Sequence, residues 1–204
     1  EPIREYLMRK GTNAVVVRDG SRQNVPVGIA AFHAIGMADI FDEWCQNDVG
    51  HVFIRMFDSI LAVWMGHPAS VCVQSKDCGQ AVIIEANGDL YSCDHYVYHA
   101  NRLGNIHSQS LVSIVTGKKQ NKFGKVKSSR LTSECQQCDV YSLCYGGCPK
   151  HRIISSPTEK YRHNYLCPSY RHIFNYTAPI MARMADEIRK GGVAANVIVN
   201  RHIF

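Results

Sequence analysis

The sequence lacks a long apolar run, and this absence excludes a membrane-spanning helix. Such a helix needs roughly 18–20 consecutive apolar residues, whereas the longest strongly apolar stretch here is residues 60–65. The first ten residues, EPIREYLMRK, contain no apolar signal core and no initiator Met. We therefore expect a fragment or processed product that folds in the reducing cytoplasm and has no membrane partner.

Low-complexity tracts and repeats of solenoid period are also absent. The chain has 204 residues, of which 46% are hydrophobic and 20% are charged. This composition excludes wholesale disorder and allows the packed core of one medium domain, or of one domain plus a short piece of another.

The formal net charge of +6 raises the question of nucleic-acid binding. One stretch is densely basic and contains Lys118, Lys119, Lys122, Lys125, Lys127 and Arg130. Its single aromatic residue, Phe123, is too little for stacking on bases. We interpret the stretch as a solvated helix face and expect no nucleic-acid partner.

Cysteine is what the sequence has in excess. Nine cysteines are an odd number, and the chain is too long for a disulfide-stapled miniprotein. Eight of them lie between Cys72 and Cys167, whereas Cys45 stands alone beside Trp44, as expected for a buried, inert thiol. This asymmetry predicts a cysteine-poor region, 1–67, and a cysteine-rich region, 68–204, joined near His67-Pro68.

The apolar spacing and turn residues predict an α+β fold. We expect a strand at 13–18, helices around 32–44 and 53–64, short helices at 110–116 and 118–127, and a long helix within 165–189. Asn87-Gly88 suits the tight turn of a hairpin over 82–91. Pro179 is expected to kink or split the last helix, and Gly191-Gly192 to end it.

The eight clustered cysteines fall into two groups along the chain. The first comprises Cys72, Cys78 and Cys93, and the second Cys135, Cys138, Cys144, Cys148 and Cys167. The dense second run ends in Cys-Pro like a ferredoxin run, whose last cysteine ligates the other cluster. If Cys148 crosses over in this way, two complete four-thiolate sets result: Cys72, Cys78, Cys93, Cys148 and Cys135, Cys138, Cys144, Cys167.

Spacing alone leaves the bound metal open. Thiolates suit both iron–sulfur clusters and zinc, although a four-cysteine zinc site usually has two pairs separated by a dozen or more residues. Gly146 and Gly147 either allow the backbone to approach a bulky cluster and donate N–H groups to its sulfurs, or form an ordinary tight turn.

Four segments carry a resemblance to the SPASM extension of radical SAM enzymes: CGQAVIIEANGDLYSCDHYV, LGNI, CQQCDVYSLCYGGCPKHR and NYLCPSY. More narrowly, the chain resembles the anaerobic sulfatase-maturating enzymes from about residue 41 through 170. The resemblance implies the last strand and helices of a (β/α)6 partial barrel over 1–67 and a SPASM domain over 68–204. It also implies two [4Fe–4S] clusters, ligated by the crossed sets described above.

The family's activity implies a function for these clusters. The enzymes oxidise a Cys or Ser of a sulfatase polypeptide to Cα-formylglycine, using S-adenosylmethionine and a third [4Fe–4S] cluster. Asp94 takes the position of the family's proposed general base, whereas His95 is expected to be structural. Two clusters of charge −2 would also lower the formal charge from +6 to about +2, which weakens the case for nucleic-acid binding.

One departure from the family is large. The Cys-x3-Cys-x2-Cys motif that binds the third cluster is absent from these 204 residues. We therefore expect S-adenosylmethionine and that cluster only in a full-length parent, no catalysis by this chain alone, and self-association through surface that the barrel would cover. The alternative is a truncated metal-binding or protein-interaction module without catalysis.

Overall fold

The protein is described here from a computed structural model that covers residues 26–79, 81–155 and 157–199. The strand expected at 13–18 lies outside these residues. The first described element is helix α2 (Pro26–Glu43), which continues into a π-helical turn at Trp44–Asp48 and is followed by α3 (Arg55–Trp64). Both helices confirm the apolar spacing seen in the sequence.

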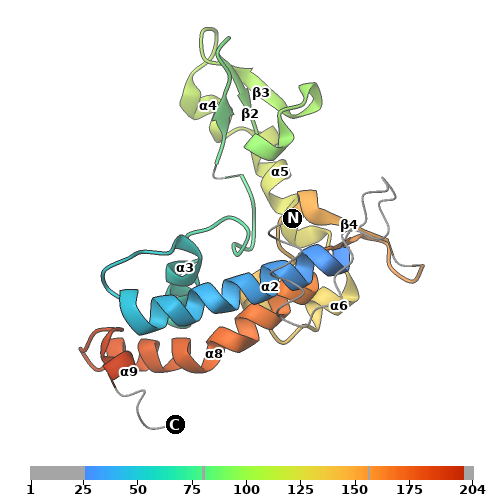
Figure 1. Cartoon of the computed structure of the whole chain (residues 1–204). Helices are drawn as coiled ribbons and strands as arrows, with labels where there is room; N and C mark the ends of the chain where they lie inside the picture. The colour runs from blue at the N-terminus through green and yellow to red at the C-terminus, as the bar shows by residue number, and fades with distance from the viewer. Residues whose placement is uncertain (1–25, 80, 156, 200–204) are drawn as a thin grey trace, which may run out of the picture.

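A long C-terminal helix, α8 (Cys167–Arg189), packs along α2 and α3 (Figure 1). Pro179 lies inside α8 without ending it, and Gly191, at φ 87°, follows its last turn. The short helix α9 (Asn196–Val199) packs against α8. Most of the apolar residues predicted for α8 are buried: Ile173, Phe174, Met181 and Met184.

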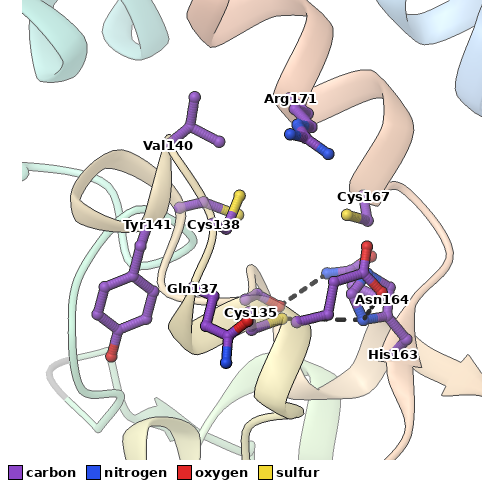
Figure 2. Close-up of a pocket in the computed structure, with 12 residues that line it drawn as sticks. Cys135, Gln137, Cys138, Val140, Tyr141, His163, Asn164, Cys167 and Arg171 are labelled. Carbon is purple, nitrogen blue, oxygen red and sulfur yellow. Dashed lines mark hydrogen bonds and ion pairs between the residues drawn. The ribbon is translucent and has the colours of Figure 1, made fainter.

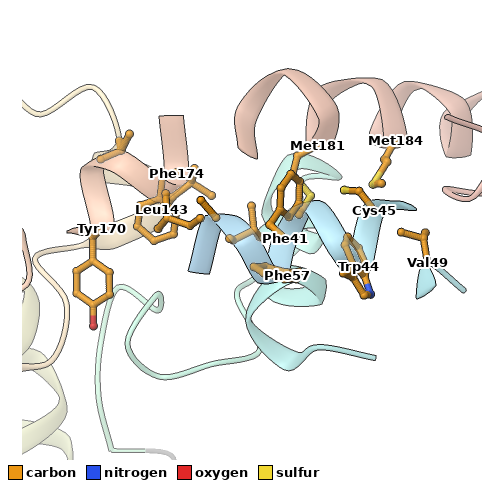
Figure 3. Close-up of a cluster of buried hydrophobic side chains, with 14 of the residues drawn as sticks. Phe41, Trp44, Cys45, Val49, Phe57, Leu143, Tyr170, Phe174, Met181 and Met184 are labelled. Carbon is orange, nitrogen blue, oxygen red and sulfur yellow. The ribbon is translucent and has the colours of Figure 1, made fainter. Parts of the chain in front are cut away.

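The main hydrophobic core lies between these helices (Figure 3). Phe41 and Phe57 meet edge to face with ring centroids 5.1 Å apart, a favoured aromatic geometry. Cys45 is fully buried in this core, as predicted. The helix expected from residue 53 begins only at Arg55, and Phe53, which precedes it, is 79% exposed.

A small antiparallel sheet occupies the far end of the molecule (Figure 1). Its strands are β1 (Ile83–Ile84), β2 (Asp89–Tyr91) and β3 (Arg102–Asn105), in the order β1-β2-β3. Gly88 adopts φ 82° in the predicted hairpin turn. Two single turns of 3-10 helix, Asp94–Tyr96 and His99–Asn101, separate β2 from β3.

Short elements fill the space between the sheet and the helical core. Helices α4 (Leu111–Val115) and α5 (Lys118–Ser129) confirm the two predicted short helices. They are followed by α6 (Ser133–Gln136), α7 (Tyr141–Cys144), a 3-10 turn at Pro149–His151, and the strand pair β4 (Arg152–Ile154) and β5 (His163–Asn164). The observed elements confirm the predicted α+β class.

The boundary proposed near residue 67 stays a prediction. Residues on both sides of it contribute to one core, because α8 packs on α2 and α3. Among the described helices, none combines the length and apolarity that crossing a membrane requires.

Candidate metal centre

Four of the predicted ligand thiols line one cavity of about 230 Å³. They are Cys135, Cys138, Cys144 and Cys167, the set that remains when Cys148 is assigned to the other group. Figure 2 shows three of these thiols around the cavity, with Arg171 above them on α8 and His163 on β5. We call this arrangement the second site.

Helix ends position the thiols of the second site. Cys135 lies in α6, whose N-cap residue Thr132 accepts a hydrogen bond from the Cys135 backbone N–H at 3.2 Å. Cys144 is the last residue of α7, and Cys167 is the first residue of α8.

The thiols of the second site interact electrostatically. Burial is the main reason why the pKa of the Cys144 thiol rises to about 12. A hydrogen bond from the backbone N–H of Gly146 lowers this pKa, whereas the charges of three neighbouring thiols raise it: Cys167, Cys135 and Cys138. A thiol with a raised pKa keeps its proton until a metal ion displaces it. The N–H group of Gly146 near a cysteine sulfur also agrees with the role predicted for this glycine.

His163 is a member of the second site that the sequence analysis missed. Its Nδ1 lies 3.8 Å from Cys135 Sγ and 3.2 Å from Thr132 Oγ1. Interactions with the thiols of Cys135 and Cys167 raise the pKa of His163 to about 10. A protonated imidazole would therefore face any anionic group held by these thiols.

The remaining four predicted thiols influence one another electrostatically. We call this group the first site, because it contains the thiols that come first in the chain: Cys72, Cys78, Cys93 and Cys148. Burial raises the pKa of Cys78, and charges at Cys148 and Cys72 raise it further. Burial and a hydrogen bond to Asp94 raise the pKa of Cys93 to about 12, with an added contribution from Cys148. The structure thus brings Cys148 close to the thiols of the first site, although Cys144, four residues away, belongs to the second.

The first site is built from loops that side chains of distant elements hold in place. Ser59 Oγ in α3 accepts hydrogen bonds from the backbone N–H groups of Ser70 at 3.0 Å and Val71 at 3.3 Å. These two residues directly precede Cys72 in the chain. The backbone N–H of Cys78 donates to the carbonyl of Gly124 in α5 at 3.0 Å. A Cβ at Gly124 would lie 2.5 Å from the Cys78 carbonyl oxygen, so this contact requires glycine.

Lys127 corrects the interpretation of the basic run as a solvated face. The neighbouring lysines of α5 are exposed, but Lys127 is fully buried. Its ammonium group donates to the carbonyls of Cys72 at 2.7 Å and Val73 at 3.0 Å, and also to that of Ser75. One lysine of the run therefore holds the loop that carries Cys72.

Asp94 lies at the exposed edge of the first site. Its Oδ1 accepts hydrogen bonds from Cys93 Sγ at 3.0 Å and from the His95 backbone N–H at 2.9 Å. The bond from Cys93 lowers the pKa of Asp94, so the carboxylate is ionised at neutral pH. His95 Nδ1 lies 3.5 Å from Cys148 Sγ, which places His95 beside a thiol of the same site.

The spread of the thiols distinguishes a single ion from a larger group. A tetrahedral zinc ion with Zn–S bonds of about 2.3 Å needs sulfurs roughly 3.8 Å apart. Within the described residues, only Cys93, Asp94 and His95 bring three ligand atoms within 4.8 Å of one another. No three of the eight thiols do so.

Polar atoms without partners also fit a bound group at the first site. Gln74, in the loop between Cys72 and Cys78, is 1% exposed, and neither of its amide atoms has a hydrogen-bond partner among the described residues. His151 lies three residues after Cys148, and its Nδ1 atom is also buried without a hydrogen-bond partner among the described residues. Buried N–H groups of this kind are suitable donors to the sulfurs of a cluster.

Comparison with known proteins identifies a domain in the cysteine-rich part of the chain. The family model described as SPASM, an iron–sulfur cluster-binding domain, matches residues 72–139. The matched stretch contains all three early thiols of the first site and the first two of the second. The class of protein defined here is therefore that of iron–sulfur SPASM proteins.

Curated relatives narrow this class. The chain is 43% identical over 162 residues to the serine-type anaerobic sulfatase-maturating enzyme of Bacteroides thetaiotaomicron, an alignment that covers 79% of this chain and 39% of that protein. It is 31% identical over 155 residues to the cysteine-type enzyme of Clostridium perfringens, covering 75% of this chain and 41% of the relative. This chain belongs to the anaerobic sulfatase-maturating enzyme family, and it spans about two fifths of the length of these relatives.

Solved structures give the same result. A structure described as native anSMEcpe with bound AdoMet and Cp18Cys peptide superposes with a TM-score of 0.68 at 27% identity. The match covers 91% of this chain and 53% of that one. The fold is therefore that of the corresponding portion of a radical SAM sulfatase maturase.

Proposed function

We propose that this chain is the auxiliary-cluster portion of an enzyme that oxidises a Cys or Ser of a sulfatase polypeptide to Cα-formylglycine in the cytoplasm. In this proposal, Cys72, Cys78, Cys93 and Cys148 hold one [4Fe–4S] cluster, and Cys135, Cys138, Cys144 and Cys167 hold another. The observation that supports the proposal is electrostatic, because Cys148 contributes to the raised pKa values of Cys78 and Cys93.

The residues of this chain supply binding and proton transfer. Oxidising a Ser side chain to the aldehyde removes one hydrogen atom, one proton and one electron from the target residue. The same loss from a Cys side chain gives a thioaldehyde, which water converts to the aldehyde with release of hydrogen sulfide. The ionised, exposed carboxylate of Asp94 is a suitable acceptor for the proton. The clusters, when bound, supply a route for the electron.

The first hydrogen atom has to be removed elsewhere in the protein. These 204 residues contain no Cys-x3-Cys-x2-Cys spacing. We therefore assign S-adenosylmethionine and a third [4Fe–4S] cluster to parts of the full-length protein outside this chain, and we expect no formylglycine formation by the chain alone.

Anaerobic purification followed by iron, sulfide and zinc analysis tests the proposal. Two four-iron clusters require about eight iron atoms per chain and a broad visible absorbance. Stoichiometric zinc without that absorbance would contradict the assignment. Tight, salt-sensitive binding to arbitrary DNA would contradict the expectation of no nucleic-acid partner.

A further inference from the structure

The segment that connects the two sites has an unusual backbone. Tyr145, Gly146 and Gly147 all have positive φ angles, of 46°, 72° and 60°. Three consecutive left-handed residues are rare, and Tyr145 bears the steric cost of a side chain in this region. The turn lies between Cys144 of the second site and Cys148 of the first, so its shape determines which site each thiol faces.

Arg152 binds the carbonyl of every residue in this turn. Its Nη2 donates to Tyr145 O at 3.1 Å and to Gly147 O at 3.4 Å, and its Nε donates to Gly146 O at 3.2 Å. Its Nη1 donates to the carbonyls of Lys127 at 2.9 Å and Arg130 at 2.6 Å, at the end of α5. One guanidinium group thus joins the strained turn to the helix that holds the Cys72 loop.

The charge of Arg152 is shared by both sites. Burial lowers the pKa of Arg152, and thiols of both sites counteract this effect: Cys135, Cys78, Cys144 and Cys148. The ion pairs found among the described residues do not include Arg152. A partly buried cation needs a compensating anion, and clusters of charge −2 on either side would provide it.

We propose that Arg152 is a positioning residue shared by the two cluster sites, which holds Cys144 and Cys148 facing opposite sites and stabilises the reduced state of both clusters. The inference rests on the proposed function, because it requires two clusters. A nearby positive charge favours the more negative, reduced form of a cluster. Loss of the charge therefore lowers both reduction potentials.

Three variants of the anaerobically reconstituted full-length protein test this role. Arg152→Gln removes the charge, Arg152→Lys keeps the charge without the five-donor fork, and Arg171→Gln is the matched control. Arg171 lines the cavity of the second site and forms an ion pair with Asp139 at 3.1 Å. Iron content and an EPR-monitored redox titration are measured for each variant, with Cys148→Ser used to assign the signals.

The expected results separate the three variants. Arg152→Gln changes the ratio of reduced to oxidised form at least tenfold for both auxiliary clusters at a fixed potential, a downward shift of about 59 mV or more. Arg171→Gln shifts only the cluster of the second site. Arg152→Lys shifts the potentials less than Arg152→Gln does. Both variants lose part of the iron from both sites, because most of the bonds to the turn are gone, so the potentials are measured on the clusters that remain.

Several outcomes would overturn the inference. An Arg152→Gln shift confined to one cluster, or no shift, contradicts the shared role, and so does iron loss from one site only. If Arg152→Gln does not fold, the Arg152→Lys variant is the test of the proposal. Full iron content and wild-type reduction potentials in that variant would contradict the role of the guanidinium fork. These results leave the proposed function intact, whereas a wild-type protein without iron removes both.

Discussion

The two cysteine sites are built in contrasting ways. The second site is a cavity lined by four thiols, three of which lie in the helices α6, α7 and α8, and by His163 and Arg171. The first site is open: Cys72 is exposed, and its loop depends on contacts from Ser59 and Lys127. An open site needs anchors from elsewhere in the fold, but it also leaves Asp94 accessible to a substrate.

The largest expected effect concerns the division of thiols between the sites. Cys148→Ser should remove the cluster of the first site and about half of the iron, whereas Cys144→Ser should remove that of the second. Cys45→Ser, in the hydrophobic core, should keep all the iron. Iron analysis with EPR of each variant checks this division, and loss of the same signal in both Cys144 and Cys148 variants would refute it.

The second prediction uses a feature that the two sites share. Each has an aspartate directly after a cysteine whose Sγ donates to it: Cys93 to Asp94 at 3.0 Å, and Cys138 to Asp139 at 3.4 Å. In the full-length enzyme, Asp94→Asn should slow formylglycine formation about 10²–10⁴-fold, because a general base is lost.

Asp139→Asn is the matched control for this experiment, because Asp139 is paired with Arg171 and Asn175. It should leave the rate within a few-fold of wild type. Mass spectrometry of a sulfatase peptide measures the product, and iron analysis verifies that both clusters are present. A normal rate in the Asp94→Asn enzyme would remove the general-base role.

The third prediction tests the anchoring of the first site. Lys127→Met should lower the free energy of unfolding by about 2–4 kcal/mol, because three backbone carbonyls lose a charged donor inside the protein. Iron should be lost from the first site and kept in the second. Lys125→Met, on the exposed side of α5, should change stability by less than about 0.5 kcal/mol. Denaturant unfolding measures both, and equal effects would contradict the anchoring role.

The smallest effect concerns the hairpin that leads to Cys93. Hydrogen bonds from Arg102 and Asn105 lower the pKa of Asp89 to about 2, below the ordinary value of 3.8. The stabilisation by ionised Asp89 is therefore complete above about pH 4 and is lost as the pH falls toward 2. Asp89→Asn should flatten the acid-unfolding profile between these values, and an unchanged profile would contradict this assignment.

The sequence predicted the features that depend on local spacing. The apolar periodicity predicted α3 and α8, and Asn87-Gly88 predicted the hairpin turn. The assignment of Cys148 by the Cys-Pro rule stays a prediction. Such patterns can be read in one dimension because the residues that create them are neighbours along the chain.

The features that the sequence did not predict depend on tertiary contacts. Strands of two or three residues, such as β4 and β5, are too short to show a period. Lys127 belongs to a lysine-rich helix, and only the approach of the Cys72 loop buries it. His163 lies outside the segments that carry the family resemblance, and Arg152 ends one of them without a predicted role. The contacts of both residues are with carbonyls and thiols that the fold brings to them.

Helix α8 connects the metal chemistry with the helical core. It starts at Cys167, a thiol of the second site, and its last residue, Arg189, donates to the Trp64 carbonyl at the end of α3 at 2.6 Å. Its 23 residues span roughly 35 Å. In the proposed function, coordination of a cluster by Cys167 holds one end of this helix, and apolar packing holds the other. Oxidative damage that removes the iron would then release the first end alone. After such damage, the core between α2, α3 and α8 would stay folded, whereas the cysteine-rich part of the chain would lose the clusters that hold it together.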